Sequence, residues 1–256
     1  MIEYSARSHV GRVRENNEDN LYVDGVFLTA TTREFPFAID GCATLPAVFA
    51  VCDGMGGEDN GELASMAAVW QLMLAEDAIK DTASDQLDEM VQQLANEMTE
   101  AILSDIPNSE KRSGTTLALA IVTESGICCF NIGDSRIYVL HRRKFKQVTH
   151  DHTPGGLPGN RLTRCIGIGG AAEAEGYPPL PATSRILICS DGLTDMVDAA
   201  EIKELLRASG STAKAADALL STALAKGGRD NVTVIVADVK KSSSSFFRSF
   251  KKRWKG

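Results

Sequence analysis

The chain has 256 residues, of which 43% are hydrophobic and 24% charged, the usual balance of a water-soluble globular protein. No apolar run is long enough to cross a bilayer, and the first residues, MIEYSARSHV, lack the apolar core of a signal peptide. The net charge of −7 conceals an asymmetry: residues 240–256 carry seven basic residues and no acidic one, which leaves 20 basic against 34 acidic residues elsewhere. Such an acidic body disfavours nucleic-acid binding. The six cysteines show no CxxC spacing, so we expect reduced thiols in a cytoplasmic protein.

The first predicted elements are strands at Leu21–Leu28 and Val48–Cys52, joined by an irregular surface segment over Thr29–Pro46. Asn60–Glu76 has helical composition and an apolar face. Ser84–Ser104 places apolar residues at three- and four-residue spacing, which is the period of an amphipathic helix. Two adjacent helices are therefore expected after the first strands.

The second half of the chain alternates groups of strands and helices. Apolar runs predict strands at Thr115–Thr123, Gly126–Ile132, Ser135–Leu140, Lys144–Val148, Ile186–Cys189 and Val232–Val239, with the third paired to the fourth. A Gly- and Pro-rich loop is expected at His150–Arg164, and helices are expected at Asp195–Ala208 and Thr212–Lys226. Because pairs of helices separate groups of strands, the order predicts an α+β fold with helices outside a mostly antiparallel layered core.

Acidic turns stand at the ends of several predicted strands. Asp53 and Asp191 each follow a strand, Asp230 precedes one, and Glu18 and Asp19 lie before the first. Carboxylates at strand ends can converge on one rim, where two of them about 4 Å apart repel by roughly 4 kcal/mol at an effective dielectric of about 20. Such a cluster requires cations. Oxygen ligands without nearby His or Cys point to Mg²⁺ or Mn²⁺ rather than Zn²⁺.

Each acidic turn has an ordinary explanation when it is taken alone. The Asp53 turn is then a plain hairpin, Arg14–Asp19 a solvated run of charges, and Gly133–Arg136 a type I turn with an Asp cap. Asp195 could simply begin a helix. The metal-site interpretation therefore depends on finding all of these turns in one chain.

The order of the motifs resembles that of the metal-dependent protein serine/threonine phosphatases of the 2C type, in their bacterial form. The matching segments are Arg14–Asp19 (RENNED), Asp53–Gly57 (DGMGG), Ser113–Thr116 (SGTT), Gly133–Arg136 (GDSR), Thr149–Thr153 (THDHT), Ser190–Leu193 (SDGL) and Asp230–Thr233 (DNVT). They cover nearly all of residues 1–239, so this range is expected to be the phosphatase domain and residues 240–256 a basic, flexible tail.

The resemblance implies a four-layer αββα sandwich, in which two antiparallel sheets are flanked by helix pairs, with two Mn²⁺ or Mg²⁺ ions at one end. Asp53 would bridge the two ions, whose shared water attacks phosphoserine or phosphothreonine, and Arg14 would hold the substrate phosphate. Glu18 and Asp19 would act largely through the waters of the second ion. The implied metal ligands are Asp53, the Gly54 carbonyl, Asp191, Asp230, Glu18 and Asp19, with Asp134 and Asp195 for a third, weaker ion.

Three places depart from the family's pattern. Met55 stands where animal relatives have a His proposed as general acid, so a metal-bound water is one candidate proton donor. His150 and His152 are alternatives for that role, although structural hydrogen bonding is favoured for both. Glu58 stands where bacterial members usually carry a His. Pro154–Asn160 is shorter than the family's usual flap, which helps to select substrates, so an open site is expected.

The resemblance also implies a monomer that acts on phosphorylated proteins and opposes a bacterial Ser/Thr kinase. The rival interpretation is a catalytically weak member that binds phosphoproteins as a regulatory module. If Phe246–Gly256 formed a helix, its aromatic side chains would share one face, which is typical of an anchor for anionic lipid or an acidic partner. Such an anchor would place the protein at the inner membrane, whereas a disordered tail is the competing interpretation.

Overall fold

Two antiparallel sheets lie face to face in the computed structural model, which describes residues 1–30, 32, 36–56, 60–105, 113–154, 162–168 and 172–240. Within these residues the first sheet has six strands, in the order β11 (Lys144–Gln147), β10 (Arg136–His141), β13 (Arg185–Cys189), β14 (Val232–Val239), β1 (Ile2–His9) and β4 (Phe37–Ala43). In the same ranges the second sheet also has six, in the order β12 (Glu175–Leu180), β9 (Ile127–Ile132), β8 (Leu117–Val122), β5 (Ala47–Cys52), β2 (Asn20–Val23) and β3 (Val26–Phe27). Neighbouring strands pair antiparallel, as predicted, including β10 with β11.

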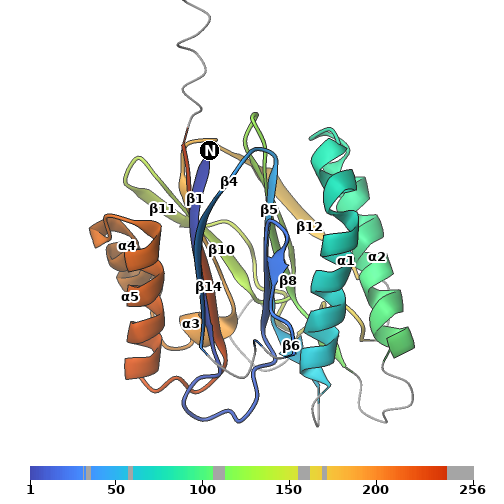
Figure 1. Ribbon diagram of the computed structural model, residues 1–256, viewed down its shortest axis with the longest axis horizontal. Coiled ribbons are helices and arrows are strands. Elements are labelled where there is room, and N and C mark those ends of the chain that lie inside the picture. Colours follow the sequence, from blue (N-terminus) through green and yellow to red (C-terminus); the bar gives the residue numbers. More distant parts are fainter. Residues whose placement is uncertain are drawn as a thin grey trace, which may run out of the picture.

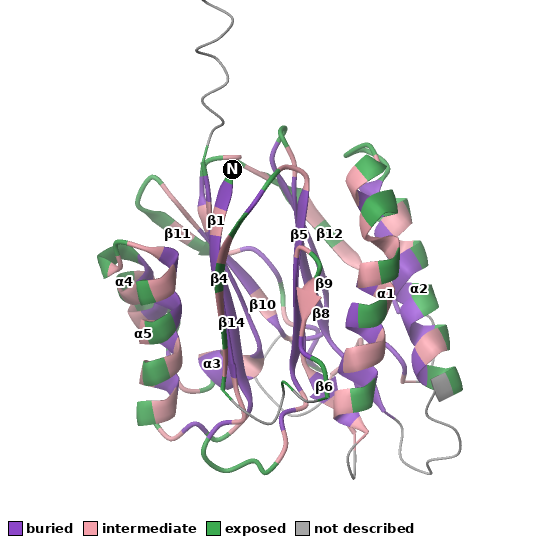
Figure 2. Cartoon of the chain, in the orientation of Figure 1, coloured by how far each residue is buried: buried purple, intermediate pink, exposed green. Residues whose placement is uncertain are grey.

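Helices cover the outer face of each sheet (Figure 1). α1 (Gly61–Asp81) and α2 (Leu87–Asp105) pack on the second sheet, while α4 (Ala199–Ala208) and α5 (Thr212–Ala225) pack on the first. One apolar layer fills the space between the sheets and another lies under each helix pair. Figure 2 shows the result as buried central strands and helices whose exposed residues face outward. The expected four-layer αββα sandwich is confirmed.

Burial on both faces explains why the central strands have continuous apolar sequences. In β5 every residue is buried, because Phe49 and Val51 contribute to the layer between the sheets and Val48 and Ala50 to the layer under α1 and α2. An alternating apolar and polar pattern would leave polar groups in one of these two layers. The strand ends at the edge of the sandwich, where Asp53 follows it.

Two elements expected in the first half of the chain are wrong in detail. Leu21–Leu28 is a hairpin and not a single strand, because Asp24 and Gly25 adopt positive φ angles of 47° and 93° and reverse the chain between β2 and β3. Thr29–Pro46 is not wholly irregular, since it contains β4, which pairs with β1. β4 stands at the edge of its sheet with alternate residues exposed, and so it lacks an apolar run.

The second half also departs from expectation. The helix expected over Asp195–Ala208 begins only at Ala199, as α4, and a separate single turn, α3 (Asp191–Thr194), comes before it. α4 begins after Asp198, whose carboxylate accepts two backbone N–H hydrogen bonds of 2.9 Å at the helix start. β12 is missing from the expected strands because its sequence, EGYPPL, contains two prolines, which only an edge strand tolerates.

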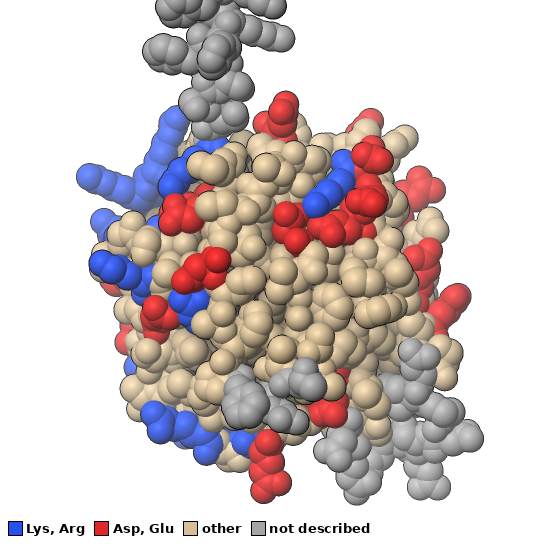
Figure 3. All heavy atoms as spheres, viewed as in Figure 1, with Lys and Arg blue, Asp and Glu red and all other residues tan. Residues whose placement is uncertain are grey.

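The helix pairs differ in charge. α1 and α2 together contain nine acidic residues and one basic residue. On the face seen in Figure 3, Lys and Arg gather mainly on the side of α4, α5 and β11. No helix in the described part of the chain is both long and apolar enough to cross a bilayer. The division into a domain over 1–239 and a tail over 240–256 stays a prediction, because all of the tail except Lys240 lies outside the described residues.

Candidate active site

Acidic side chains from distant parts of the chain line one pocket of about 280 Å³ at the end of the sandwich. Asp53 follows β5, Asp134 follows β9, Asp191 follows β13, and Asp230 stands just before β14. The other predicted residues in the lining are Arg14, Glu18, Gly54 and Asp195. Asp19, which is also described, lies behind the lining and is fully buried. The fold thus brings together residues that the sequence predicted to converge.

Hydrogen bonds from the next strand fix the position of Asp53. Its backbone N–H donates to Thr116 Oγ1 at 2.9 Å, and its carbonyl accepts from Thr115 Oγ1 at 3.0 Å and from the Thr116 N–H at 2.9 Å. Thr116 Oγ1 also lies 2.7 Å from Ser135 Oγ. The two motifs SGTT and GDSR therefore hold the backbone of Asp53, which leaves its carboxylate to face the pocket.

Close packing of backbones explains the glycine after Asp53. A Cβ atom on Gly54 would lie 2.1 Å from the Gly61 carbonyl oxygen and 2.5 Å from the Glu18 carbonyl oxygen. The Gly54 N–H donates to that same Glu18 oxygen at 3.2 Å. Only glycine allows the segment around Glu18, the turn after β5 and the start of α1 to meet at this point.

Asn231 holds the segment that contains Arg14 and Glu18. Its side-chain nitrogen donates to the carbonyl oxygens of Val10 (2.9 Å) and Asn16 (2.8 Å), and its side-chain oxygen accepts from the Glu18 N–H (2.8 Å). Both the nitrogen and the oxygen of the Asn231 amide are therefore hydrogen-bonded to the same loop. The sequence showed this residue only as part of a polar turn, so its positioning role was not predicted.

Ser190 connects the last strands to the buried Asp19. Its hydroxyl donates to Asp19 Oδ2 at 2.8 Å and accepts from the Thr233 N–H at 3.0 Å. Like Asn231, Ser190 is a polar residue next to an acidic one within a recognisable motif, whereas the motif of Thr116 contains no acidic residue. That proximity is the signal in the sequence, but the partner of each side chain becomes visible only in the fold.

The pocket has an excess of negative charge. Burial, together with repulsion from Asp19 and Asp191, raises the pKa of Asp53 well above its usual range. Burial and repulsion from Asp134 raise the pKa of Asp191 to about 8. At the rim, Arg14 Nη2 lies 2.7 Å from Asp230 Oδ2. No group of three His, Cys, Asp or Glu side chains in the described residues is already arranged to hold an ion.

The histidines of the THDHT motif have structural partners. His152 Nδ1 accepts the Gly133 N–H at 3.1 Å, and Nε2 lies 2.9 Å from Glu175 Oε2. The more exposed His150 has its Nδ1 3.4 Å from Glu175 Oε1. Between them, Asp151 accepts a two-pronged hydrogen bond from the Arg136 guanidinium, which joins this motif to GDSR. Neither histidine lines the pocket.

Two departures from the family's pattern cannot be placed in the fold. Glu58 and residues 155–160 of the shortened flap lie outside the described residues. The open site expected from the short flap therefore stays a prediction. Met55, which stands in place of the animal His, lines the pocket with a thioether that cannot transfer a proton.

Known proteins share both the sequence and the fold of this chain. A family model for protein phosphatase 2C matches residues 39–226. The serine/threonine phosphatase stp of Listeria monocytogenes is 31% identical over 255 residues, which cover 91% of this chain and 94% of that protein. PstP of Mycobacterium tuberculosis is 32% identical, over 93% of this chain and 45% of that longer protein.

Solved structures agree with these sequence matches. The catalytic domain of PstP in complex with two manganese ions is 30% identical, with a TM-score of 0.71 and coverage of 93% of this chain and 99% of that one. A bacterial serine phosphatase gives a TM-score of 0.78 at 25% identity, with coverage of 95% and 100%. The family match spans well over half of the chain, and relatives above 30% identity align with nearly all of it. This chain belongs to the protein phosphatase 2C family.

Proposed function

We propose that this chain hydrolyses phosphoserine and phosphothreonine in proteins with two bound divalent cations, Mn²⁺ or Mg²⁺. The observation that carries the proposal is the single pocket in which Asp53, Asp191 and Asp230 converge from three strands beside Arg14. Relatives of this chain support the proposal, because the Listeria protein and PstP are both named serine/threonine phosphatases.

The donor atoms in the pocket fit these cations. The titratable groups among its described lining residues are carboxylates and one guanidinium, and hard oxygen donors suit Mg²⁺ and Mn²⁺. The raised pKa values of Asp53 and Asp191 indicate a local shortage of positive charge. The two manganese ions of the PstP structure support the same assignment. We assign two ions to Asp53, the Gly54 carbonyl, Asp191, Asp230, Glu18 and Asp19, and a third, weaker one to Asp134 and Asp195.

A divalent cation, when bound, lowers the pKa of water and offsets negative charge on a phosphoryl group. The contribution of the chain itself is to position its groups. The hydrogen bonds from Thr115 and Thr116 keep Asp53 at the floor of the pocket. Arg14 has half of its side chain exposed at the rim, where its remaining N–H groups can grip two phosphate oxygens while Asp230 orients the guanidinium.

The proposed partners are phosphorylated proteins, including a bacterial Ser/Thr kinase whose action the enzyme reverses. The acidic body supports a protein substrate over a nucleic acid. The tail over 240–256 supplies the basic and aromatic residues of a contact with anionic membrane or an acidic partner, and the enzyme acts as a monomer.

Hydrolysis of p-nitrophenyl phosphate and of a phosphoserine peptide tests the proposal. With Mn²⁺ present, the wild-type chain is expected to release phosphate from both, and Asp53→Asn is expected to remove that activity. Asp85→Asn, an exposed carboxylate distant in sequence from every site motif, serves as the matched control. Tight binding of phosphopeptide without hydrolysis by the wild type would favour the rival interpretation, a regulatory module.

A further inference from the structure

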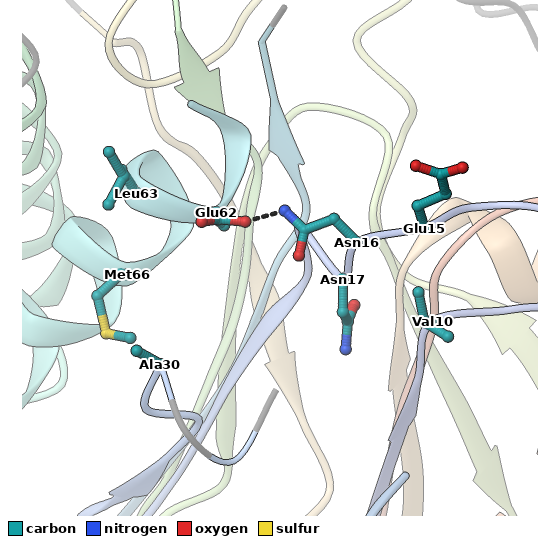
Figure 4. A pocket seen from close by; sticks show the side chains of 8 residues that line it. All are labelled: Val10, Glu15, Asn16, Asn17, Ala30, Glu62, Leu63 and Met66. Carbon is teal, nitrogen blue, oxygen red and sulfur yellow. Dashed lines mark hydrogen bonds between the residues drawn. The ribbon is translucent and has the colours of Figure 1, made fainter. Parts of the chain in front are cut away.

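A second and larger pocket lies next to the proposed active site. It has a volume of about 570 Å³, which falls within the range of roughly 300–1,000 Å³ typical of ligand sites. One part of its lining comes from the RENNED motif, with Glu15 and Asn16, and another from the first turns of α1, with Glu62, Leu63 and Met66 (Figure 4). The proposed chemistry makes no use of this pocket.

The two pockets share a wall. The segment Arg14–Asp19 contributes Arg14 and Glu18 to the active site, and Glu15 and Asn16 to the second pocket. The start of α1 completes the wall, because a Cβ on Gly61 would lie only 2.5 Å from Glu18 Oε1. A peptide that crosses this wall can place a phosphorylated side chain in one pocket and a nearby residue in the other.

The second pocket combines carboxylates with apolar groups. Glu62 accepts a hydrogen bond from the Asn16 side chain, and Figure 4 shows Leu63 and Met66 at the opposite end from Glu15. None of the described lining residues is basic. A lysine or arginine side chain suits this lining, because its hydrocarbon stem packs on apolar groups and its charged head pairs with a carboxylate.

The surroundings strengthen this preference for positive charge. The first turns of α1 form one side of the pocket, and the helix pair to which they belong, α1 and α2, carries nine acidic residues against a single lysine. A surface of one dominant sign attracts segments of the opposite sign and repels acidic ones. A phosphoserine flanked by acidic residues would therefore bind less well here than one flanked by basic residues.

An apolar surface extends the pocket along α1. Leu63 and Met66 also line a neighbouring pocket that reaches Trp70 and, on α2, Ala101. Trp70 is 48% exposed, and its ring is held by an edge contact with Phe27, with 6.1 Å between ring centroids. The extension offers a place for an apolar residue beyond the basic one.

We infer that the second pocket selects phosphoproteins that carry lysine or arginine close to the phosphorylated residue. The inference rests on the proposed phosphatase function and names the substrate class of the same site. It assigns Glu15 and Glu62 as residues that determine specificity, without a part in the chemical step.

The test uses the full chain with Mn²⁺ and phosphoserine peptides in which one arginine is moved through the positions on either side of the phosphoserine. Each peptide has a partner with glutamine at that position. Phosphate release gives kcat/KM for the wild type, Glu15→Gln and Glu62→Gln; glutamine at 62 still accepts the hydrogen bond from Asn16. Glu89→Gln, an equal loss of charge on the exposed face of α2, is the control.

For at least one position, arginine is expected to raise kcat/KM of the wild type about three- to fivefold over glutamine, the size of one half-exposed ion pair. Glu15→Gln and Glu62→Gln are expected to reduce this preference, whereas Glu89→Gln is expected to keep it. Turnover of p-nitrophenyl phosphate should be unchanged in all three variants.

Two results would overturn the inference and leave the proposed phosphatase function standing: hydrolysis by the wild type without an arginine preference, or an arginine preference that survives both pocket variants. Faster turnover of every peptide by Glu15→Gln would also overturn the inference. That result would mean that Glu15 normally holds a basic segment of the chain itself in the pocket, and that the variant releases it. Failure of the wild type to hydrolyse any substrate would overturn the proposed function as well.

Discussion

Replacement of Asp191 by Asn is expected to stabilise the metal-free protein while it removes phosphatase activity. Asp191 lines the acidic pocket, and burial, followed by repulsion from Asp134 and Asp195, raises its pKa from 3.8 to about 8. The folded metal-free protein therefore binds this proton more tightly than the unfolded chain does. Asparagine keeps the size of the side chain but carries no charge that folding must bury.

The size of the effect depends on pH. Because folding raises the pKa of Asp191, the wild-type protein keeps its stability at low pH, where Asp191 is protonated in both states. It loses stability as the pH rises from about 4 to about 8. At about 1.4 kcal/mol for each tenfold change in proton affinity, the whole difference is at most ~6 kcal/mol. Relaxation of the neighbouring carboxylates and entry of water reduce the net cost, so we expect a gain of roughly 1–3 kcal/mol for Asp191→Asn near pH 8.

Chemical denaturation in EDTA checks this expectation. The free energy of unfolding of Asp191→Asn should exceed that of the wild type by an amount that is small near pH 5 and grows toward pH 8, while Asp85→Asn follows the wild type at each pH. A variant that is less stable than the wild type near pH 8, or a difference that does not change with pH, would refute the reasoning.

Three further changes probe the positioning groups and the tail. Gly54→Ala should lower the free energy of unfolding by about 2–3 kcal/mol, since its Cβ would lie 2.1 Å from the Gly61 carbonyl oxygen; an unchanged denaturation midpoint would contradict this packing. Arg14→Ala should raise KM for a phosphopeptide about tenfold, and an unchanged KM would exclude Arg14 as the phosphate-binding group. Deletion of residues 241–256 should reduce flotation with anionic liposomes, and equal flotation with and without them would dispose of the membrane anchor.

The sequence predicts most clearly the strands that are buried on both faces. Val48–Cys52 and Ile186–Cys189 are buried on both faces, so their apolar runs identify them as central strands. β4 and β12 lie at sheet edges, where the first alternates and the second tolerates prolines, and so neither has an apolar run. The hairpin at Asp24 did carry a signal, because Asp-Gly is typical of a tight turn.

In the site, the sequence identifies the charged groups better than the groups that hold them. Asp53, Asp191 and Asp230 stand out as a set, because each alone could be an ordinary turn residue, whereas carboxylates next to several strands of one chain can converge on one site. Thr116 and Asn231 form hydrogen bonds with residues distant in the sequence, and no local pattern encodes such partners. Their roles follow from the strand register, which places each next to its acidic neighbour in space.

Calorimetric titration with Mn²⁺ tests the central claim most directly. The wild-type chain is expected to bind two Mn²⁺ ions with measurable heat, and Asp53→Asn is expected to lose most of that binding without unfolding. If the wild type takes up no Mn²⁺ or Mg²⁺, or if Asp53→Asn binds them as well as the wild type, the assignment of the acidic pocket as a metal-dependent phosphatase site is wrong.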